Sequence, residues 1–423
     1  MVTKRFSLTA ASMLVALSSA QAANTPPAKY WMSVATEAGF GGGMAGGGMP
    51  SAGEMVTGGL LGGIFGGGKS SRSDPDGARR SLLLQLSGPN VPADPKADHF
   101  IPPGQKMGES LPLLTPTSGK LTRREISSDD APEREKPKGR ILIYWGCGDK
   151  IRAGQPKVLD MASASPQQYA GFFKSYGGNA PRGPRPANGW TYGRWPHERD
   201  SQDVPNDSSL AGPQTITSNY GPEIRFDIPR QQDFMAPVVF TEKSGGQGEA
   251  TTLRWKDIAN ASGYFSMAMG GMGDNEMVIW VSSETLHMGW SLMDYQPTGE
   301  VRKLIKERVV MPPSVTECKI PQGVFKNEGA MLQFIAYGYD LDTAYPARPK
   351  NAPKNWQPDW TAKVRLKSTN MTMLGDNRGH ANKGGDDSEQ GRDYSSRSQS
   401  DSGGGKPGGF ANPIKSLKGL LGF

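Results

Sequence analysis

The 423-residue chain has few of the residues on which most metal and catalytic sites depend. Its four histidines stand far apart in the sequence, and no H-x-x-x-H or H-E-x-x-H spacing joins them. The familiar zinc sites are therefore not supported. No G-x-S-x-G elbow or S-x-x-K signature stands in a suitable setting, which argues against the common serine hydrolases and penicillin-binding enzymes. We expect neither a metal nor another cofactor.

Cysteine is equally scarce. The chain has two, Cys147 and Cys318, and no C-x-x-C motif, so a thioredoxin-like redox site is excluded. In an exported chain the two can form a single disulfide that joins the two halves of the folded region. Two buried free thiols, or no contact at all, are the alternatives. We predict the disulfide.

Long apolar runs and an excess of one charge are also missing. No run after the N-terminus approaches the ~18 apolar residues of a membrane-spanning helix. The 48 basic and 41 acidic residues give a net charge of only +7. No dense Lys/Arg stripe with interleaved aromatic residues appears, so we expect no binding to nucleic acid. The modest positive charge permits contact with anionic surfaces, or it is simply a solubilising mixed-charge surface.

The N-terminus has the pattern of a secretory signal peptide over residues 1–22. Lys4 and Arg5 form a basic region, Phe6 to Leu17 an apolar one, and Ala20-Gln21-Ala22 a cleavage site. Residue 23 is Ala and not the acylated Cys of a bacterial lipoprotein. We therefore expect export to the periplasm or the extracellular space.

Glycine and proline are abundant, with 56 and 34 residues. Gly-rich, Pro-rich or Ser-rich stretches at 23–79, at 90–138 and at 371–423 predict long disordered segments, because such stretches bury too little apolar surface to offset the entropy of ordering. The Gly-rich stretch also carries Leu, Ile and Phe. It is either a flexible linker or a segment that adheres to membrane, wall or partner.

The stretch that most resembles ordinary folded protein is Thr251 to Glu284. Leu253 and Trp255 alternate with polar residues, as in a half-buried strand, and two apolar runs follow that are separated by the turn sequence GGMGDN. The Leu-x-Trp spacing followed by Ala-Ser-Gly-Tyr264 resembles a fibronectin type III-like sandwich over about residues 251–340. This resemblance implies a core shared by Trp255 and Tyr264.

These patterns predict a mainly β protein of two β-sandwich-like domains. The first, 80–245, contains the insert 90–138, and its strands Arg80–Leu86 and Arg140–Trp145 are expected to pair. The second is 246–370, in which Val301–Met311 is expected to be a charged edge strand.

A loop of arginines and aromatic residues is the candidate ligand site. Aromatic rings stack on sugars or bases, and guanidinium groups bind carboxylate or phosphate. The alternative is an irregular loop that is fixed to the fold by its tryptophans. The candidate residues are Arg185, Trp190, Tyr192, Arg194, Trp195 and His197.

The last eleven residues, 413–423, form a short cationic amphipath that could contact a membrane or a partner protein. Two functions remain open. The first is an exported, non-catalytic protein that binds a cell-envelope component, a glycan or a protein. The second is a secreted carbohydrate-active hydrolase with its site in the loop Trp190–Glu198, which would need two facing carboxylates.

Overall fold

The computed structural model describes residues 26–39, 78–116, 139–160, 163–165, 167, 182–245, 249–271, 276–287, 289–326 and 329–375. The predicted signal peptide, the Gly-rich tract after residue 39 and the C-terminal amphipath lie outside the described residues.

The fold is mainly β, as predicted. The strands are β1 (Ala28–Gly39), β2 (Arg79–Gly88), β3 (Ala97–Phe100), β4 (Ser110–Pro112), β5 (Arg140–Trp145), β6 (Lys157–Asp160), β7 (Thr191–Trp195), β8 (Gly212–Ser218), β9 (Ile224–Ile228), β10 (Phe240–Ser244), β11 (Thr251–Trp255), β12 (Ala261–Gly271), β13 (Glu276–Val281), β14 (Glu317–Ile320), β15 (Ala330–Gly338), β16 (Leu341–Tyr345) and β17 (Trp360–Leu374). The helical elements are α4 (Thr298–Lys306) and the short 3-10 turns η2 (Pro103–Gln105), η3 (Arg230–Gln232) and η4 (Trp290–Met293).

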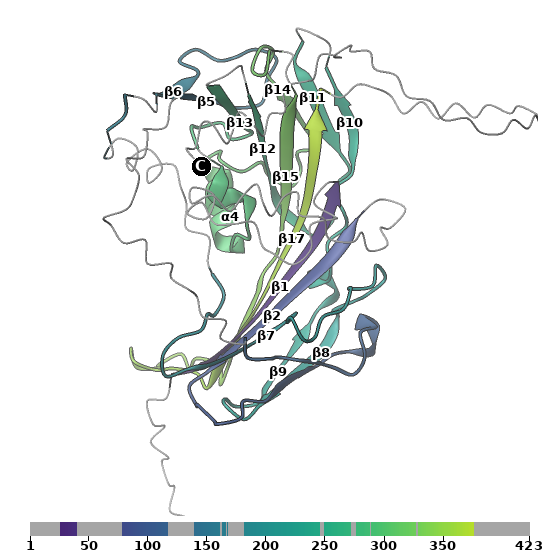
Figure 1. Cartoon of the computed structure of the whole chain (residues 1–423), viewed down its shortest axis with the longest axis vertical. Coiled ribbons are helices and arrows are strands. Elements are labelled where there is room, and N and C mark those ends of the chain that lie inside the picture. Colours follow the sequence, from purple (N-terminus) through teal and green to yellow (C-terminus); the bar gives the residue numbers. More distant parts are fainter. Residues whose placement is uncertain are drawn as a thin grey trace, which may run out of the picture.

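A ten-stranded sheet forms the centre of the molecule (Figure 1). Its strand order is β6-β5-β13-β12-β15-β17-β1-β2-β7, and β16 pairs with β17. β1 runs parallel to β17, and β5 runs parallel to β13. Two smaller sheets, β10-β11-β14 and β4-β3-β8-β9, complete the fold.

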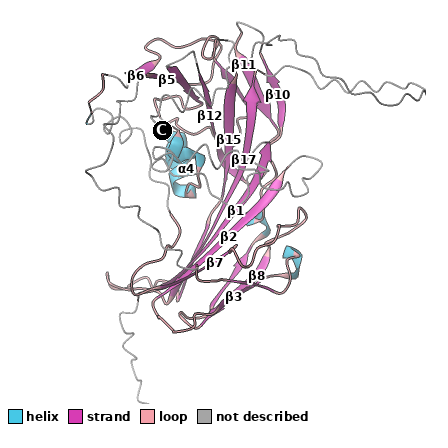
Figure 2. Ribbon diagram, viewed as in Figure 1, coloured by secondary structure: helices cyan, strands magenta, loops and turns pink. Residues whose placement is uncertain are grey.

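The pleat of the large sheet divides its side chains between two cores. On β13, Val278 and Trp280 join the larger core, which also contains residues of both small sheets. Ile279 and Val281 point the other way, into a second core with α4. Figure 2 shows α4 on one side of the large sheet and the small sheets on the other. We call the face toward the small sheets the inner face and the opposite one the outer face.

The core shared by Trp255 and Tyr264 is confirmed. Trp255 comes from β11 in the three-stranded sheet and Tyr264 from β12 in the large sheet, and their ring centroids lie 5.6 Å apart. Phe334 of β15 packs against both rings. The two sheets thus bury one aromatic cluster between them.

A buried polar contact joins the large sheet to the four-stranded sheet. Tyr30 Oη lies 3.2 Å from His99 Nδ1, and His99 Nε2 lies 2.9 Å from Gln214 Oε1. The Gln214 amide nitrogen donates to the Leu210 carbonyl, so its oxygen faces the histidine. His99 is therefore neutral with its proton on Nε2, and the tyrosine hydroxyl donates to Nδ1. Burial lowers the pKa of His99 to about 4, against a smaller opposing effect of the Gln214 hydrogen bond.

Three sequence predictions need correction. Within the predicted flexible segment 23–79, residues 28–39 form the strand β1. This part of the segment comes before the Gly-rich tract, and most of its side chains are buried in the sheet. The predicted disordered insert begins with ordered chain, since β3 and β4 lie within 90–116. Its apolar residues are sparse but are buried in the larger core, as Ile101, Leu111 and Leu113 are. The predicted edge strand after residue 300 is instead largely the helix α4, because Val301 and Leu304 are buried at helical spacing.

Strand pairing also differs from expectation. β2 pairs with β1 and β7, and not with β5, which pairs with β13 and β6. Strands from both sides of the expected boundary near residue 245 are therefore hydrogen-bonded in one sheet. The expected boundary does not divide the large sheet.

Candidate functional site

The six predicted ligand residues do not gather into one site. Trp195 is 1% exposed and belongs to the inner core, where its indole N–H donates to Asp200. His197 is buried, with Nδ1 accepting the Arg199 N–H and Nε2 3.0 Å from a Glu198 oxygen. Both residues therefore have structural contacts, but Trp195 belongs to the strand β7 and not to an irregular loop.

Three of the other four predicted residues lie near one another: burial raises the pKa of Tyr192, against smaller opposing effects of the Gln85 hydrogen bond and of the nearby Arg194 and Arg185. Tyr192 and Arg194 alternate with the inward-facing Trp195 on β7, and so lie on the outer face of the sheet. Trp190 is half-buried and Arg185 is exposed. Tyr192 accepts a hydrogen bond from the Gln85 amide, and Arg194 is ion-paired with Glu198 at 2.6 Å.

A row across the outer face links Arg194 to residues far away in the sequence. Arg194 of β7 is paired with Gln85 of β2, Gln85 with Trp31 of β1, and Trp31 with Lys363 of β17. Residues opposite each other on neighbouring strands have adjacent side chains on the same face. The predicted loop therefore supplies one end of a row of polar and aromatic side chains.

At the other end of this row, cations and aromatic rings alternate. Lys363 Nζ and the Arg365 guanidinium carbon lie 5.6 and 5.0 Å from the Trp31 ring centroid. Arg365 and Lys367 lie 4.3 and 4.4 Å from the centroid of Tyr295. We call these five residues the cation–aromatic ladder.

The sequence of β17 explains how the cations share one face. In Lys-Val-Arg-Leu-Lys, Val364 and Leu366 enter the inner core, and the period of two places the three cations on the outer face. Tyr295 comes from the segment between η4 and α4. Asp340 fixes the end of that segment by accepting the backbone N–H of Thr298.

The lysines of the ladder have carboxylate partners. Lys363 lies 2.7 Å from Asp342 and 3.4 Å from Asp340. Lys367 Nζ lies 3.2 Å from Asp294. Arg365 donates from Nε to the hydroxyl of Ser33 on β1 at 2.7 Å. Three cations and three carboxylates therefore meet around the ladder.

These contacts shift the pKa of the acidic groups. Burial disfavours the charged form of Asp294, but the nearby Lys367 and Arg365 outweigh it and hold its pKa below the ordinary value. The pKa of Asp340 is also lowered, since hydrogen bonds from Thr298 and the charge of Lys363 exceed the effect of burial. Burial raises the pKa of Glu37, against the smaller opposing charges of Lys367 and Arg79.

A small cleft with a cavity volume of about 10 Å³ lies beside the ladder, which is room for about one water molecule. A typical small-molecule site measures ~300–1,000 Å³. Its lining combines aromatic and apolar walls with charged groups. The lining residues are Trp31, Tyr295, Gln296, Pro297, Asp340, Lys363 and Arg365.

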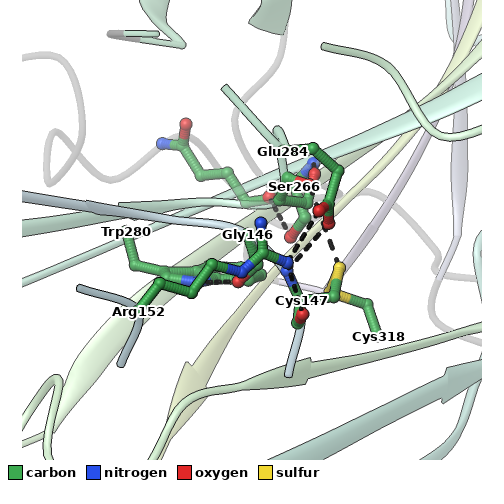
Figure 3. The surroundings of a disulfide bond; sticks show 9 residues. Gly146, Cys147, Arg152, Ser266, Trp280, Glu284 and Cys318 are labelled. Atoms are coloured by element: carbon green, nitrogen blue, oxygen red, sulfur yellow. Dashed lines mark hydrogen bonds and ion pairs between the residues drawn. A yellow bond between two sulfur atoms is a disulfide. The ribbon is translucent and has the colours of Figure 1, made fainter. Parts of the chain in front are cut away.

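The predicted disulfide between Cys147 and Cys318 is confirmed (Figure 3). Cys147 follows β5 of the large sheet and Cys318 lies on β14, so the bond joins the large sheet to the three-stranded sheet. Beside it, Arg152 and Glu284 form an ion pair at 2.7 Å. The indole N–H of Trp280 donates to the carbonyl of Gly146. These contacts make the region a structural junction.

Within the described part of the chain, no group of three or more His, Cys, Asp or Glu residues is arranged to hold a metal ion. No helix there is long and apolar enough to cross a membrane. No family model, curated protein or solved structure matches this chain. A function must therefore be proposed from the geometry.

Sequence reasoning missed the ladder, although two signals pointed to it. The Lys-x-Arg-x-Lys alternation of β17 places three cations on one face of any strand. Trp31 stands in the same kind of alternation in β1. The parallel pairing of β1 with β17 could not be predicted from the sequence, because more than 300 residues separate the two strands.

Proposed function

We propose that this chain is an exported, non-catalytic protein that binds a component of the cell envelope through the outer face of β17, β1, β2 and β7. The cation–aromatic ladder is the observation that carries the proposal. Its aromatic rings are held by flanking cations, and its lysines are held by carboxylates, so the side chains are preorganised for binding.

The chemistry of the predicted catalytic loop favours binding over catalysis. A glycosidase needs one carboxylic acid of raised pKa to protonate the leaving group and a second carboxylate facing it. In the predicted catalytic loop, Glu198 is exposed and ion-paired with Arg194. Its pKa is lowered, chiefly by a backbone hydrogen bond, which makes it a poor general acid.

The hydrolase alternative retains one supporting observation at the ladder itself. Glu37 has a raised pKa and Asp294 a lowered one, and both lie near Lys367. Two carboxylates with divergent pKa values are a feature of acid–base pairs. Release of new reducing ends from envelope glycans would support a hydrolase and contradict the non-catalytic proposal.

The proposal is tested by co-sedimentation of the purified mature protein with isolated cell envelopes and with anionic vesicles. We expect retention by envelopes, and loss of retention in Trp31→Ala. A matched control is Tyr345→Ala, because Tyr345 is 59% exposed on β16 and is paired with the inner-face residue Trp360. Failure of the wild-type protein to sediment with envelopes contradicts the proposal.

In this proposal the C-terminal amphipath contributes separately to binding at a membrane surface. We expect deletion of residues 412–423 to reduce binding to anionic vesicles, because Lys415 and Lys418 oppose its apolar residues. Unchanged sedimentation of the deletion variant in both assays removes the amphipath from the proposal. Export is checked by fractionation and by N-terminal sequencing, which should find Ala23 as the first residue of the mature chain.

A further inference from the structure

We infer that three methionines and a glutamine on the outer face of β15 and β17 bind a soft monovalent metal ion, of which Cu(I) and Ag(I) are the examples. The site lies at the end of the large sheet where β15 begins and β17 ends (Figure 1). It is separate from the cation–aromatic ladder, and the inference does not depend on the proposed function. The four residues are Met331, Gln333, Met371 and Met373.

The register of the two strands places these residues at the corners of a rectangle. Met331 of β15 is paired with Met373 of β17, and Gln333 is paired with Met371. Paired residues on neighbouring antiparallel strands have Cβ atoms ~5 Å apart, and residues two apart along a strand are separated by ~7 Å. Side chains at the four corners can therefore reach one ion above the centre of the rectangle.

The alternation of both strands places the four side chains on one face. Leu332 and Phe334 of β15 enter the larger core, and so does Leu374 of β17. The residues of the rectangle alternate with these and therefore lie on the outer face. Methionine is unbranched and has three rotatable bonds, so its sulfur can turn toward an ion without movement of the strands.

The three methionines of the rectangle are not core residues. Each of them is partly exposed, and neither core includes them among the described residues. Met267 of β12 is different, since it is fully buried in the second core and acts there as ordinary packing. The three thioethers of the rectangle gain little from burial and stay accessible to an ion.

Gln333 indicates that the ligand carries positive charge. This side chain is 4% exposed, and its Oε1 has no hydrogen-bond donor within the described part of the chain. A buried carbonyl oxygen without a donor is costly, and a cation bound beside it would offset the cost. An apolar partner docked on the methionines would leave the oxygen unpaired.

The ligand set selects a soft ion of single charge. Thioether sulfur is soft and neutral, so it suits Cu(I) better than Mg²⁺ or Ca²⁺, which prefer carboxylate and carbonyl oxygen. The carboxylate of β1, Glu37, lies near the cations Lys367 and Arg79 and is paired with Thr369, outside the rectangle. The residues paired directly with the rectangle on its flanking strands also lack a carboxylate, and they are Met267, Met269 and Gly39.

Histidine and cysteine spacing, on which the expectation of no metal was based, does not detect a site of this kind. Two of the three methionines stand in the sequence Met371-Thr372-Met373, where the period of a strand puts both on one face. The third comes from the neighbouring strand β15, and only the register brings it to them.

Metal titration of the purified full mature protein tests the inference. Cu(I) is added without oxygen in competition with a coloured Cu(I) chelator, Ag(I) is added in chloride-free buffer, and Zn²⁺ is the control ion. We expect Cu(I) and Ag(I) to stay bound through gel filtration and Zn²⁺ to be lost. The methyl NMR signals of the site methionines should shift in protein labelled with ¹³C-methyl methionine. Retention of Zn²⁺ alone, or of no ion, overturns the inference.

Variants assign the ion to the rectangle. Met331→Leu nearly conserves the side-chain volume, so the fold should persist, which circular dichroism checks. We expect it to weaken Cu(I) binding by at least about tenfold, a loss that is usual even for residues behind the direct ligands of a metal. The matched control is Met32→Leu, because Met32 lies in the larger core on the other face of the sheet. Equal affinity of Met331→Leu and the wild type overturns the assignment.

A second control concerns the Gly-rich tract, which also carries thioethers at Met44, Met49 and Met55. We expect a variant with leucine at these three positions to bind Cu(I) as the wild type does. Loss of binding in this variant, with unchanged binding by Met331→Leu, would place the ion on the tract and contradict the inference. Retention of the protein by envelopes is a separate measurement, so the proposed function and this inference can fail independently.

Discussion

The outer face of the large sheet has two halves of opposite character. On β5, β13, β12 and β15 it carries the apolar side chains of the core that contains α4, among them Phe265, Ile279 and Ile335. On β17, β1, β2 and β7 the same face carries the cation–aromatic ladder and the row that ends at Arg194. Among the described residues, α4 and η4 pack on the first half and leave most of the second half partly exposed.

The contrast shows how one continuous sheet divides its outer face between burial and partial exposure. Burying Lys363 or Lys367 under a helix without their carboxylates would cost several kcal/mol. Leaving Phe265 and Ile279 in water would forfeit about 2 kcal/mol each. The helix therefore covers the half that needs burial, and much of the half that tolerates water stays partly exposed.

The largest expected effect concerns the disulfide, which ties the covered half to the three-stranded sheet. Cys147 and Cys318 are 171 residues apart, and the chain-entropy account gives about 4–5 kcal/mol for a loop of that length. Equilibrium urea denaturation of the Cys147→Ser, Cys318→Ser double variant should show this loss. Mass spectrometry of the non-reduced wild type is the control, and alkylation of free thiols without denaturant would contradict the bond.

A slightly smaller effect compares the two halves directly. Phe265 is fully buried under α4, so Phe265→Ala should lower the free energy of unfolding by about 3–5 kcal/mol. Trp31 is half-buried on the open half, and Trp31→Ala should cost about 1 kcal/mol. Urea denaturation of both variants measures the difference. Equal losses in the free energy of unfolding would mean that Trp31 is packed as tightly as a core residue. The two halves of the outer face would then not differ in burial.

A dependence of stability on pH is expected from the inner face of the open half, where Tyr30 contacts His99. The unfolded histidine has a pKa of 6.5 and the buried one about 4, so between these values the unfolded chain binds more protons. The free energy of unfolding should therefore fall as the pH falls from 6.5 to 4, by about 3 kcal/mol. Above pH 6.5 this contribution is fully present.

Urea denaturation of wild type and His99→Gln across this range isolates the effect. Carboxylates titrate in both proteins, so only the difference between the two curves reports on His99. The variant should approach the wild type in stability toward pH 4. Parallel curves would show that His99 does not control the pH dependence.

Local sequence patterns predicted much of the second half of the fold. The alternation around Leu253 and Trp255 and the apolar run of β15 are visible over five to nine residues, and both became strands. The disulfide was predicted because the chain has only two cysteines and a predicted export signal. The helix α4 was misassigned because the run Val301–Met311 supplies apolar residues at both helical and strand spacing.

The candidate site was less accessible because it depends on pairing between distant strands. Of the predicted cluster, Tyr192 and Arg194 lie on the outer face of the sheet, whereas Trp195 of the same strand faces the core. Successive side chains of a strand point to opposite faces of the sheet. This rule could be applied here only once β7 was known to be a strand. The remaining ladder residues come from segments far from this cluster in the sequence.

The parallel pairing of β1 with β17 has a consequence for how the protein is made. Ser33 on β1 and Arg365 on β17 are bonded across 332 residues, and β1 lies between β17 and β2 in the middle of the sheet. The ribosome must synthesise nearly all of the described chain before β1 can meet this partner. Until then β1 and β15 each present an unpaired edge, which is prone to aggregate. A chain shortened before residue 360 should keep both edges unpaired and therefore aggregate more readily than the full chain.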